Sequence, residues 1–171
     1  MAKPAFNAMW LNYPKGDPKS VFTHIGWGEF YGKPGWENTC ALRMSIALGL
    51  SGVAIKSSAG MRALAGPLKG KWIEPRQDRL SENLREIWGE PLKCDAALGN
   101  RRLAGTDGVI SFWQIAGYDV GGQLGGHIDL IDGSVVEEKD WWGHVIDRTI
   151  SYRTAHGNYM DKCKSIWFWK L

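Results

Sequence analysis

The sequence predicts one α+β domain over residues 1–171, in which a helix that begins with a cysteine packs against an antiparallel sheet. Three observations support this prediction. Apolar residues recur at helical spacing in the first half of the chain, while short apolar runs bounded by glycines dominate the second half. The 171 residues, 44% of them hydrophobic, suffice for one core, and no linker or internal repeat divides them.

Two packing helices are expected on either side of the cysteine segment. Large apolar side chains follow a helical stripe from Ala5 to Tyr13 and stop before a proline. The segment from Lys15 to Trp36 is rich in glycine, proline and aromatic residues, which predicts a long irregular approach to the cysteine. From Asp78 to Trp88 apolar residues repeat at i, i+4, i+7 and i+8, which predicts a second helix that ends at Gly89.

The central element is the helix expected between Asn38 and Leu50, which carries Cys40 in its first turn. Asn38 or Thr39 can cap this helix, because a short side-chain oxygen accepts from the unpaired first-turn amides. Apolar or small residues recur at i, i+4 and i+7, so we expect one face of the helix to pack on the sheet.

Cys40 is the candidate nucleophile. Free N–H groups and the positive end of the helix dipole meet at its position, and both favour a thiolate. The same N–H groups can stabilise an oxyanion. The competing interpretation is that Cys40 is a small buried apolar residue, since free cysteine is among the most buried residue types.

Strands fill most of the second half. A glycine-rich loop is expected from Ile115 to Gly126, and Asp132-Gly133 is a strong hairpin signal. This signal predicts that the strands before and after it pair with each other. The strands are expected at Gly108–Gln114, His127–Ile131, Ser134–Glu138 and Ser165–Trp169.

His127 is the best candidate for the base that a cysteine nucleophile needs. It opens a strand behind two glycines, whose small size would let a substrate backbone approach the ring. With a two-residue turn at Asp132-Gly133, His127 faces Glu138, and directly opposed residues have Cβ atoms about 5 Å apart. Glu138 is therefore the expected orienting acid. Asp129, at i+2 on the same face, and Asp140, at the end of the return strand, remain possible orienters.

Composition disfavours several other functions. The net charge of +3 comes without a basic run, which argues against nucleic acid as a partner. No apolar stretch has signal-peptide or membrane-spanning length, so we expect synthesis in the cytoplasm and no membrane partner. Three cysteines without CxxC or metal-ligand spacing predict neither a disulfide framework nor a metal or other cofactor. Pairing of Cys94 with Cys163 after export stays open.

Two motifs resemble the type VI secretion amidase effector 4 family. One is the run from Asn38 to Ser45 with Leu48, Ser51 and Gly52, and the other is the run from Gly126 to Ser134. The opening segment Lys3-Pro4-Ala5-Phe6-Asn7 and the strand at Gly108 are also similar to that family, so the resemblance covers most of the chain in order.

This resemblance implies a papain-like, NlpC/P60-type fold and an antibacterial cysteine amidase. It implies hydrolysis of the γ-D-glutamyl to meso-diaminopimelate bond of peptidoglycan stem peptides. It also implies injection by the type VI secretion apparatus into the periplasm of a target cell, and a cognate immunity protein that protects the producer. The missing signal peptide fits this secretion route.

The resemblance assigns Cys40 as the nucleophile and His127 as the base. In members of that family the third catalytic residue is an aspartate at the position of Glu138. Flanking cysteines are often present there, where this chain has Val136 and Asp140. This departure leaves Asp140 as the alternative third residue.

Two rival functions remain. Ten tryptophans favour a packed core but also suit a non-catalytic wall-binding module that stacks on sugars. The second rival is a related cysteine enzyme, either a housekeeping wall endopeptidase or an acyltransferase.

Overall fold

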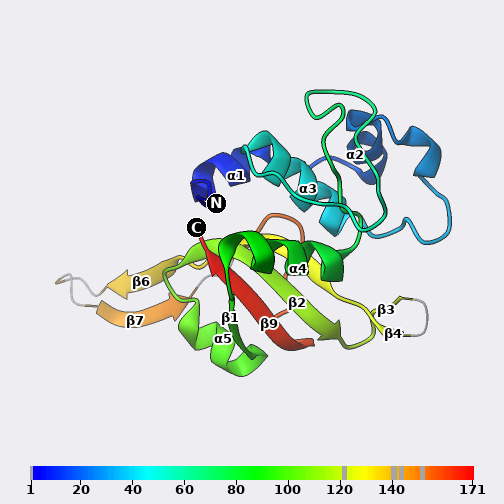
Figure 1. The fold of residues 1–171 in the computed structure, drawn as a ribbon. Coiled ribbons are helices and arrows are strands. Elements are labelled where there is room, and N and C mark those ends of the chain that lie inside the picture. The colour runs from blue at the N-terminus through cyan, green and yellow to red at the C-terminus, as the bar shows by residue number, and fades with distance from the viewer. Residues whose placement is uncertain (1, 121–122, 140–141, 143–144, 151–152) are drawn as a thin grey trace.

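A computed structural model describes residues 2–120, 123–139, 142, 145–150 and 153–171. Its centre is a five-stranded antiparallel sheet, and most of the helices and long loops lie above it (Figure 1). The α+β class and the antiparallel sheet are as predicted. The strands, in their order across the sheet, are β1 (Leu92–Asp95), β9 (Cys163–Lys170), β2 (Asp107–Ile115), β5 (His127–Asp132) and β8 (Arg153–Thr154).

Three predicted helices are confirmed, namely α1 (Phe6–Asn12), α3 (Cys40–Leu50) and α4 (Gln77–Trp88). Helix α3 contacts α1, α4 and β5, so it lies in the middle of the molecule (Figure 1). Two further helices that the sequence analysis did not predict are α2 (Pro18–His24) and α5 (Ala96–Arg102). A 3₁₀ turn, η1 (Gly28–Phe30), follows α2.

Helix α3 is buried on both sides, which corrects the expectation of one buried face. From Cys40 to Leu48 every residue is buried, and the helix separates two hydrophobic clusters. On one side it meets sheet residues such as Val109, Ile128 and Leu130. On the other side its Leu42 and Ile46 meet the cluster around α2 and the loop before Ile73, which forms an extra layer over the helix.

Helix α5 contributes to a third cluster, which includes Ile110, Ile166 and Phe168 of the sheet. Trp27 and Trp169 are among the largest fully buried side chains, so part of the tryptophan content serves the core. Trp142, in contrast, is 79% exposed. Within the described ranges, no helix combines the length and apolar character needed to cross a bilayer.

The predicted hairpin across Asp132-Gly133 is wrong. The strand after the turn, β6 (Val135–Lys139), pairs with β7 (Val145–Ile150) in a separate two-stranded sheet. Strand β5 instead has β2 and β8 as neighbours, so His127 lies opposite Phe112, and Glu138 lies opposite Asp147.

The backbone of Gly133 explains this change of partner. Its N–H donates to the carbonyl of Thr106 at 3.1 Å, and its carbonyl accepts from the N–H of Gly105. These bonds tie the turn to the loop before β2, and the chain leaves the sheet there. The β6–β7 hairpin therefore projects at one end of β5, while the short pair β3 (Asp119–Val120) and β4 (Gln123–Leu124) lies at the other (Figure 1).

Candidate active site

Cys40 is the first residue of α3, as predicted, and is 1% exposed. Its N–H donates to Asn38 Oδ1 at 3.0 Å, so Asn38 satisfies the first amide of the helix. Thr39 does not cap the helix with its side chain. The consequence is that the amide expected to stabilise an oxyanion is already engaged in the free protein.

His127 is the first residue of β5 and is 3% exposed. Its ring stacks on Phe112 and on His156, with ring centroids 6.1 and 5.7 Å away, and Tyr159 lies at 4.8 Å. These contacts hold the imidazole in one orientation.

Gly126 serves packing rather than substrate access. A Cβ at this position would collide with the side chain of Gln77, the first residue of α4, and would lie 2.8 Å from the carbonyl oxygen of Phe112. The glycine that precedes His127 is thus required for the close approach of α4 to the sheet. The expected opening for a substrate backbone at this glycine is filled by Gln77.

Asp129 orients His127. The distance from His127 Nε2 to Asp129 Oδ2 is 3.2 Å, and because a carboxylate can only accept, the imidazole donates. Asp129 is fully buried, and its Oδ2 also accepts from the backbone N–H groups of His156 and Gly157 at 2.8 and 2.7 Å. Its Oδ1 accepts from the N–H of Leu130 at 2.8 Å. These three backbone bonds fix the position of the carboxylate.

Cys40 lies close enough to His127 to act on the pKa of its imidazole. Burial disfavours the charged ring, but the hydrogen bonds and charges of Asp129 and Cys40 outweigh it and raise the pKa of His127 to about 9. The surroundings therefore favour an imidazolium at neutral pH.

Three of the predicted candidates, Cys40, His127 and Asp129, come together. Glu138 lies in β6, at the opposite end of β5 from His127, so the pairing that favoured it is absent (Figure 1). Asp140 lies outside the described residues. The i+2 spacing on one strand was the signal that pointed to Asp129, but it carried less weight than the hairpin signal.

Two buried polar residues close to Cys40 and Asp129 were not predicted as part of the site. Arg43, one turn after Cys40, is 2% exposed, and its Nη1 donates to the carbonyls of Pro14 and Gly16 at 2.7 and 2.8 Å. Tyr13 ends α1, and burial, followed by the charges of Asp129 and Cys40, raises the pKa of its hydroxyl.

The other two cysteines are free thiols. Cys94 lies opposite Ile166 on the neighbouring strand, and Cys163 lies opposite Ile115. Burial raises the pKa of both thiols, that of Cys163 to about 11, which makes them poor nucleophiles at neutral pH. In the described part of the chain, no group of three side chains is placed to hold a metal ion.

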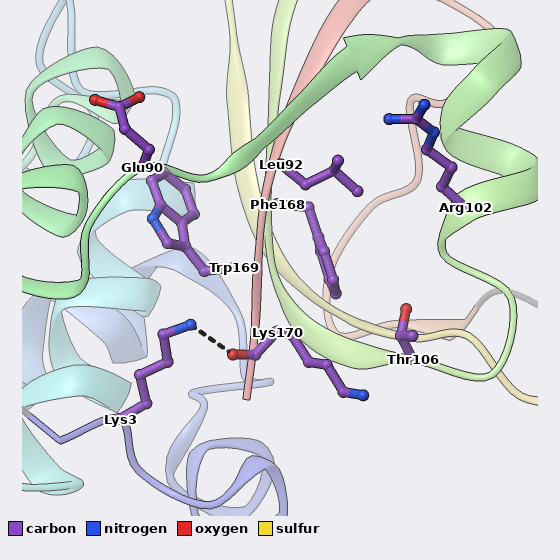
Figure 2. A pocket seen from close by; sticks show the side chains of 8 residues that line it. All are labelled: Lys3, Glu90, Leu92, Arg102, Thr106, Phe168, Trp169 and Lys170. Atoms are coloured by element: carbon purple, nitrogen blue, oxygen red, sulfur yellow. Dashed lines mark hydrogen bonds between the residues drawn. The ribbon is translucent and has the colours of Figure 1, made fainter.

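A cavity of about 340 Å³ lies apart from these residues, where the two ends of the chain meet (Figure 2). Lys3 Nζ donates to the carbonyl of Lys170 there at 2.9 Å. The lining contains none of the catalytic candidates. It is formed by Lys3, Glu90, Leu92, Arg102, Thr106, Phe168, Trp169 and Lys170.

Several solved structures share this fold over nearly the whole chain. The effector Tae4 of Enterobacter cloacae is 19% identical, with 99% of this chain and 98% of that chain covered and a TM-score of 0.70. Tae4 of Salmonella typhimurium, solved with the immunity protein Tai4 of Enterobacter cloacae, is 19% identical, with 99% of both chains covered and a TM-score of 0.70. Tae4 in the Tae4–Tai4 complex of Enterobacter cloacae is 18% identical, with 99% of both chains covered and a TM-score of 0.68.

No curated protein sequence matches the chain significantly. The sequence model of one family, described as type VI secretion system amidase effector protein 4, matches residues 36–169. This range includes Cys40, His127 and Asp129 and most of the chain. The chain therefore belongs to the type VI secretion amidase effector 4 (Tae4) family of antibacterial amidases that target peptidoglycan.

Proposed function

We propose that residues 1–171 act as one catalytic domain, a cysteine amidase that hydrolyses the γ-D-glutamyl to meso-diaminopimelate bond of peptidoglycan stem peptides. The observation that carries this proposal is the position of His127, whose imidazole is hydrogen-bonded to Asp129 and has its pKa raised by both Asp129 and Cys40. A nucleophile, a base and an orienting acid in this order are the groups that acyl transfer requires.

In this mechanism the Cys40 thiolate attacks the amide carbon of the stem peptide. The His127 imidazolium then gives its proton to the leaving amine, and a thioester forms as the C–N bond breaks. Neutral His127 next removes a proton from water, which hydrolyses the thioester and restores the thiolate. Asp129 holds the ring in place and stabilises its charged form during both steps.

The first-turn amides of α3 are proposed to stabilise the oxyanion. Because the Cys40 N–H donates to Asn38 Oδ1 in the free protein, the substrate carbonyl must displace this side chain. The exchange replaces one acceptor by another, and the developing negative charge makes the new bond the stronger one.

We propose that the type VI apparatus delivers the protein to the periplasm of a target cell, where its substrate lies. The structures of Tae4 proteins in complex with Tai4 support a second part of the proposal, that this chain also has a cognate immunity protein.

The test is digestion of diaminopimelate-type muropeptides by the wild type and by Cys40→Ala under reducing conditions, with products identified by mass spectrometry. We expect the wild type to cleave one bond, between D-glutamate and diaminopimelate, and Cys40→Ala to be inactive while its melting temperature stays near that of the wild type. Cleavage by the alanine variant would contradict the mechanism. Binding of intact peptidoglycan without new amines would instead support the tryptophan-rich binding module.

A further inference from the structure

Arg43 carries a buried positive charge that the mechanism above does not use. Its guanidinium donates from Nε to Thr39 Oγ1 at 3.0 Å and from Nη1 to the carbonyls of Pro14 and Gly16. All three acceptors are uncharged. Among the described residues, no carboxylate forms a salt bridge with Arg43 within 4.0 Å. A cation that is removed from water in this way costs free energy unless nearby charges compensate it.

The compensating charges belong to the catalytic centre. Arg43 follows Cys40 by three positions on α3, and residues three apart on a helix are neighbours. Burial lowers the pKa of Arg43, and the charges of Tyr13, Asp129, Asp17 and Cys40 act in the opposite direction. Arg43 is therefore coupled to the two acidic members of the centre.

Adding the charges of Arg43 and the three proposed catalytic residues shows how Arg43 affects the net charge of the centre. In the active form, Cys40 and Asp129 each carry one negative charge and His127 carries one positive charge, all with at most 3% exposure. These three groups leave one net negative charge in a region from which water is excluded. Arg43 brings the sum to zero.

We propose that Arg43 is a positioning residue whose buried charge balances the catalytic centre and so keeps Cys40 in its thiolate form. This inference rests on the proposed function, because it takes Cys40 as the nucleophile and His127 and Asp129 as its partners.

Other titratable groups surround the centre from each neighbouring element. Tyr13 lies at the end of α1, Asp17 caps α2, and His156 stacks on His127. Burial, followed by the charges of Cys40, Tyr159 and Glu37, raises the pKa of Tyr118 to about 12. Among these groups and the catalytic three, Arg43 is the one permanent cation.

The test compares Arg43→Lys, which keeps the charge, with Arg43→Gln, which keeps N–H donors without it. The measurement is the rate at which iodoacetamide alkylates Cys40 as a function of pH, followed by mass spectrometry of the Cys40 peptide. We expect the lysine variant to keep the wild-type midpoint. The glutamine variant should shift the midpoint upward by about one pH unit, which is about a tenfold slower reaction below it. If the glutamine variant does not fold, Arg43→Met replaces it.

Arg62→Gln is the matched control, because it removes the charge of an exposed arginine that, like Arg43, donates to a backbone carbonyl, that of Gly70 at 2.6 Å. We expect this variant to keep the wild-type midpoint. An unchanged midpoint in the folded neutral variant, with an equal loss of thermal stability in both Arg43 variants, would overturn the proposal and leave Arg43 as an anchor for the turn at Pro14. Because no peptidoglycan is used, this result is independent of which bond the enzyme cleaves.

Discussion

Strands β5 and β6 flank the same turn, yet they belong to different sheets. Strand β5 is buried at five of its six positions and has a neighbour on each side. Strand β6 is part of a separate two-stranded sheet with β7. Both strands were predicted with the same local pattern. The difference teaches that alternation and turn residues specify strands, whereas the partners of a strand depend on contacts far away in the sequence.

The contacts that decide the outcome lie in the loop before β2. Gly105 and Thr106 bind both backbone polar groups of Gly133, and a Cβ at position 133 would collide with the carbonyl of Leu103. These groups are therefore not free to close a two-residue hairpin. In the proposed site the orienting acid accordingly comes from β5 itself, where Asp129 lies two residues after His127.

The largest expected effect is a loss of activity that tests whether the acid of the centre comes from β5 or from β6. Asp129→Asn should lower kcat/KM by a factor on the order of 10² to 10⁴, because an amide cannot stabilise the imidazolium and can fix the wrong tautomer. The variant should be assayed against muropeptides, with its melting temperature measured in parallel.

Glu138→Gln is the matched control for Asp129→Asn, and we expect it to retain most of the wild-type activity. The opposite ranking, with Glu138→Gln inactive and Asp129→Asn active, would show that the acid of the catalytic centre comes from β6, as the family resemblance implies. Asp140→Asn assayed in the same series tests the remaining candidate.

An intermediate effect is expected from the glycine that joins β4 to β5. Gly126→Ala should lower the free energy of unfolding by about 1–3 kcal/mol, because the added methyl group collides with Gln77 and crowds the Phe112 carbonyl oxygen. The displacement should also move His127 and lower kcat/KM by about tenfold or more. Urea denaturation and the muropeptide assay measure the two effects.

Gly28→Ala is the control for this substitution, since nothing lies within 4 Å of a Cβ at that position. Equal losses of stability in Gly126→Ala and Gly28→Ala would refute the packing role of Gly126.

The remaining prediction concerns stability against pH. The pKa of His127 is about 9 in the folded protein and about 6.5 in an unfolded chain, so the folded state binds the proton more tightly. The resulting stabilisation is fully present below about pH 6.5 and is lost as the pH rises through 9. It amounts to roughly 3 kcal/mol at most.

The measurement is urea denaturation of the wild type and of His127→Gln between pH 6 and 10. We expect the wild type to lose stability over this range relative to the variant, while His24→Gln, which changes an exposed histidine, keeps the wild-type slope. Parallel curves for wild type and His127→Gln would contradict the raised pKa.

Much of the fold could be predicted because its elements carry their own local signals. Helices α1, α3 and α4 and strands β2, β5 and β9 all have periodic apolar residues and clear ends. Helix α2 was missed although Asp17 and Pro18 form a start signal, because the surrounding glycines and prolines favoured a loop. The burial of both sides of α3 could not be predicted, since the layer that covers it comes from segments without helical or strand patterns.

The places of Cys40 and His127 in the fold were predictable, because each depends on a local pattern. The sequence alone predicts Cys40 at a helix start and His127 at a strand start, and the structure has both residues there. The position of Asp129 beside His127 could not be predicted in this way, because two of the three N–H groups that fix its carboxylate belong to His156 and Gly157, 27 and 28 residues later in the chain. No local pattern connects those positions.

The carboxylate of Asp129 has a consequence for the order of events during folding. It joins the strand that carries His127 to a loop made much later in synthesis, so the centre is complete only after that loop has formed. In the proposed mechanism the Cys40 thiol, made early, depends on His127 and on this later loop. Because such non-local contacts form slowly, we expect a partly folded chain to contain the thiol without amidase activity.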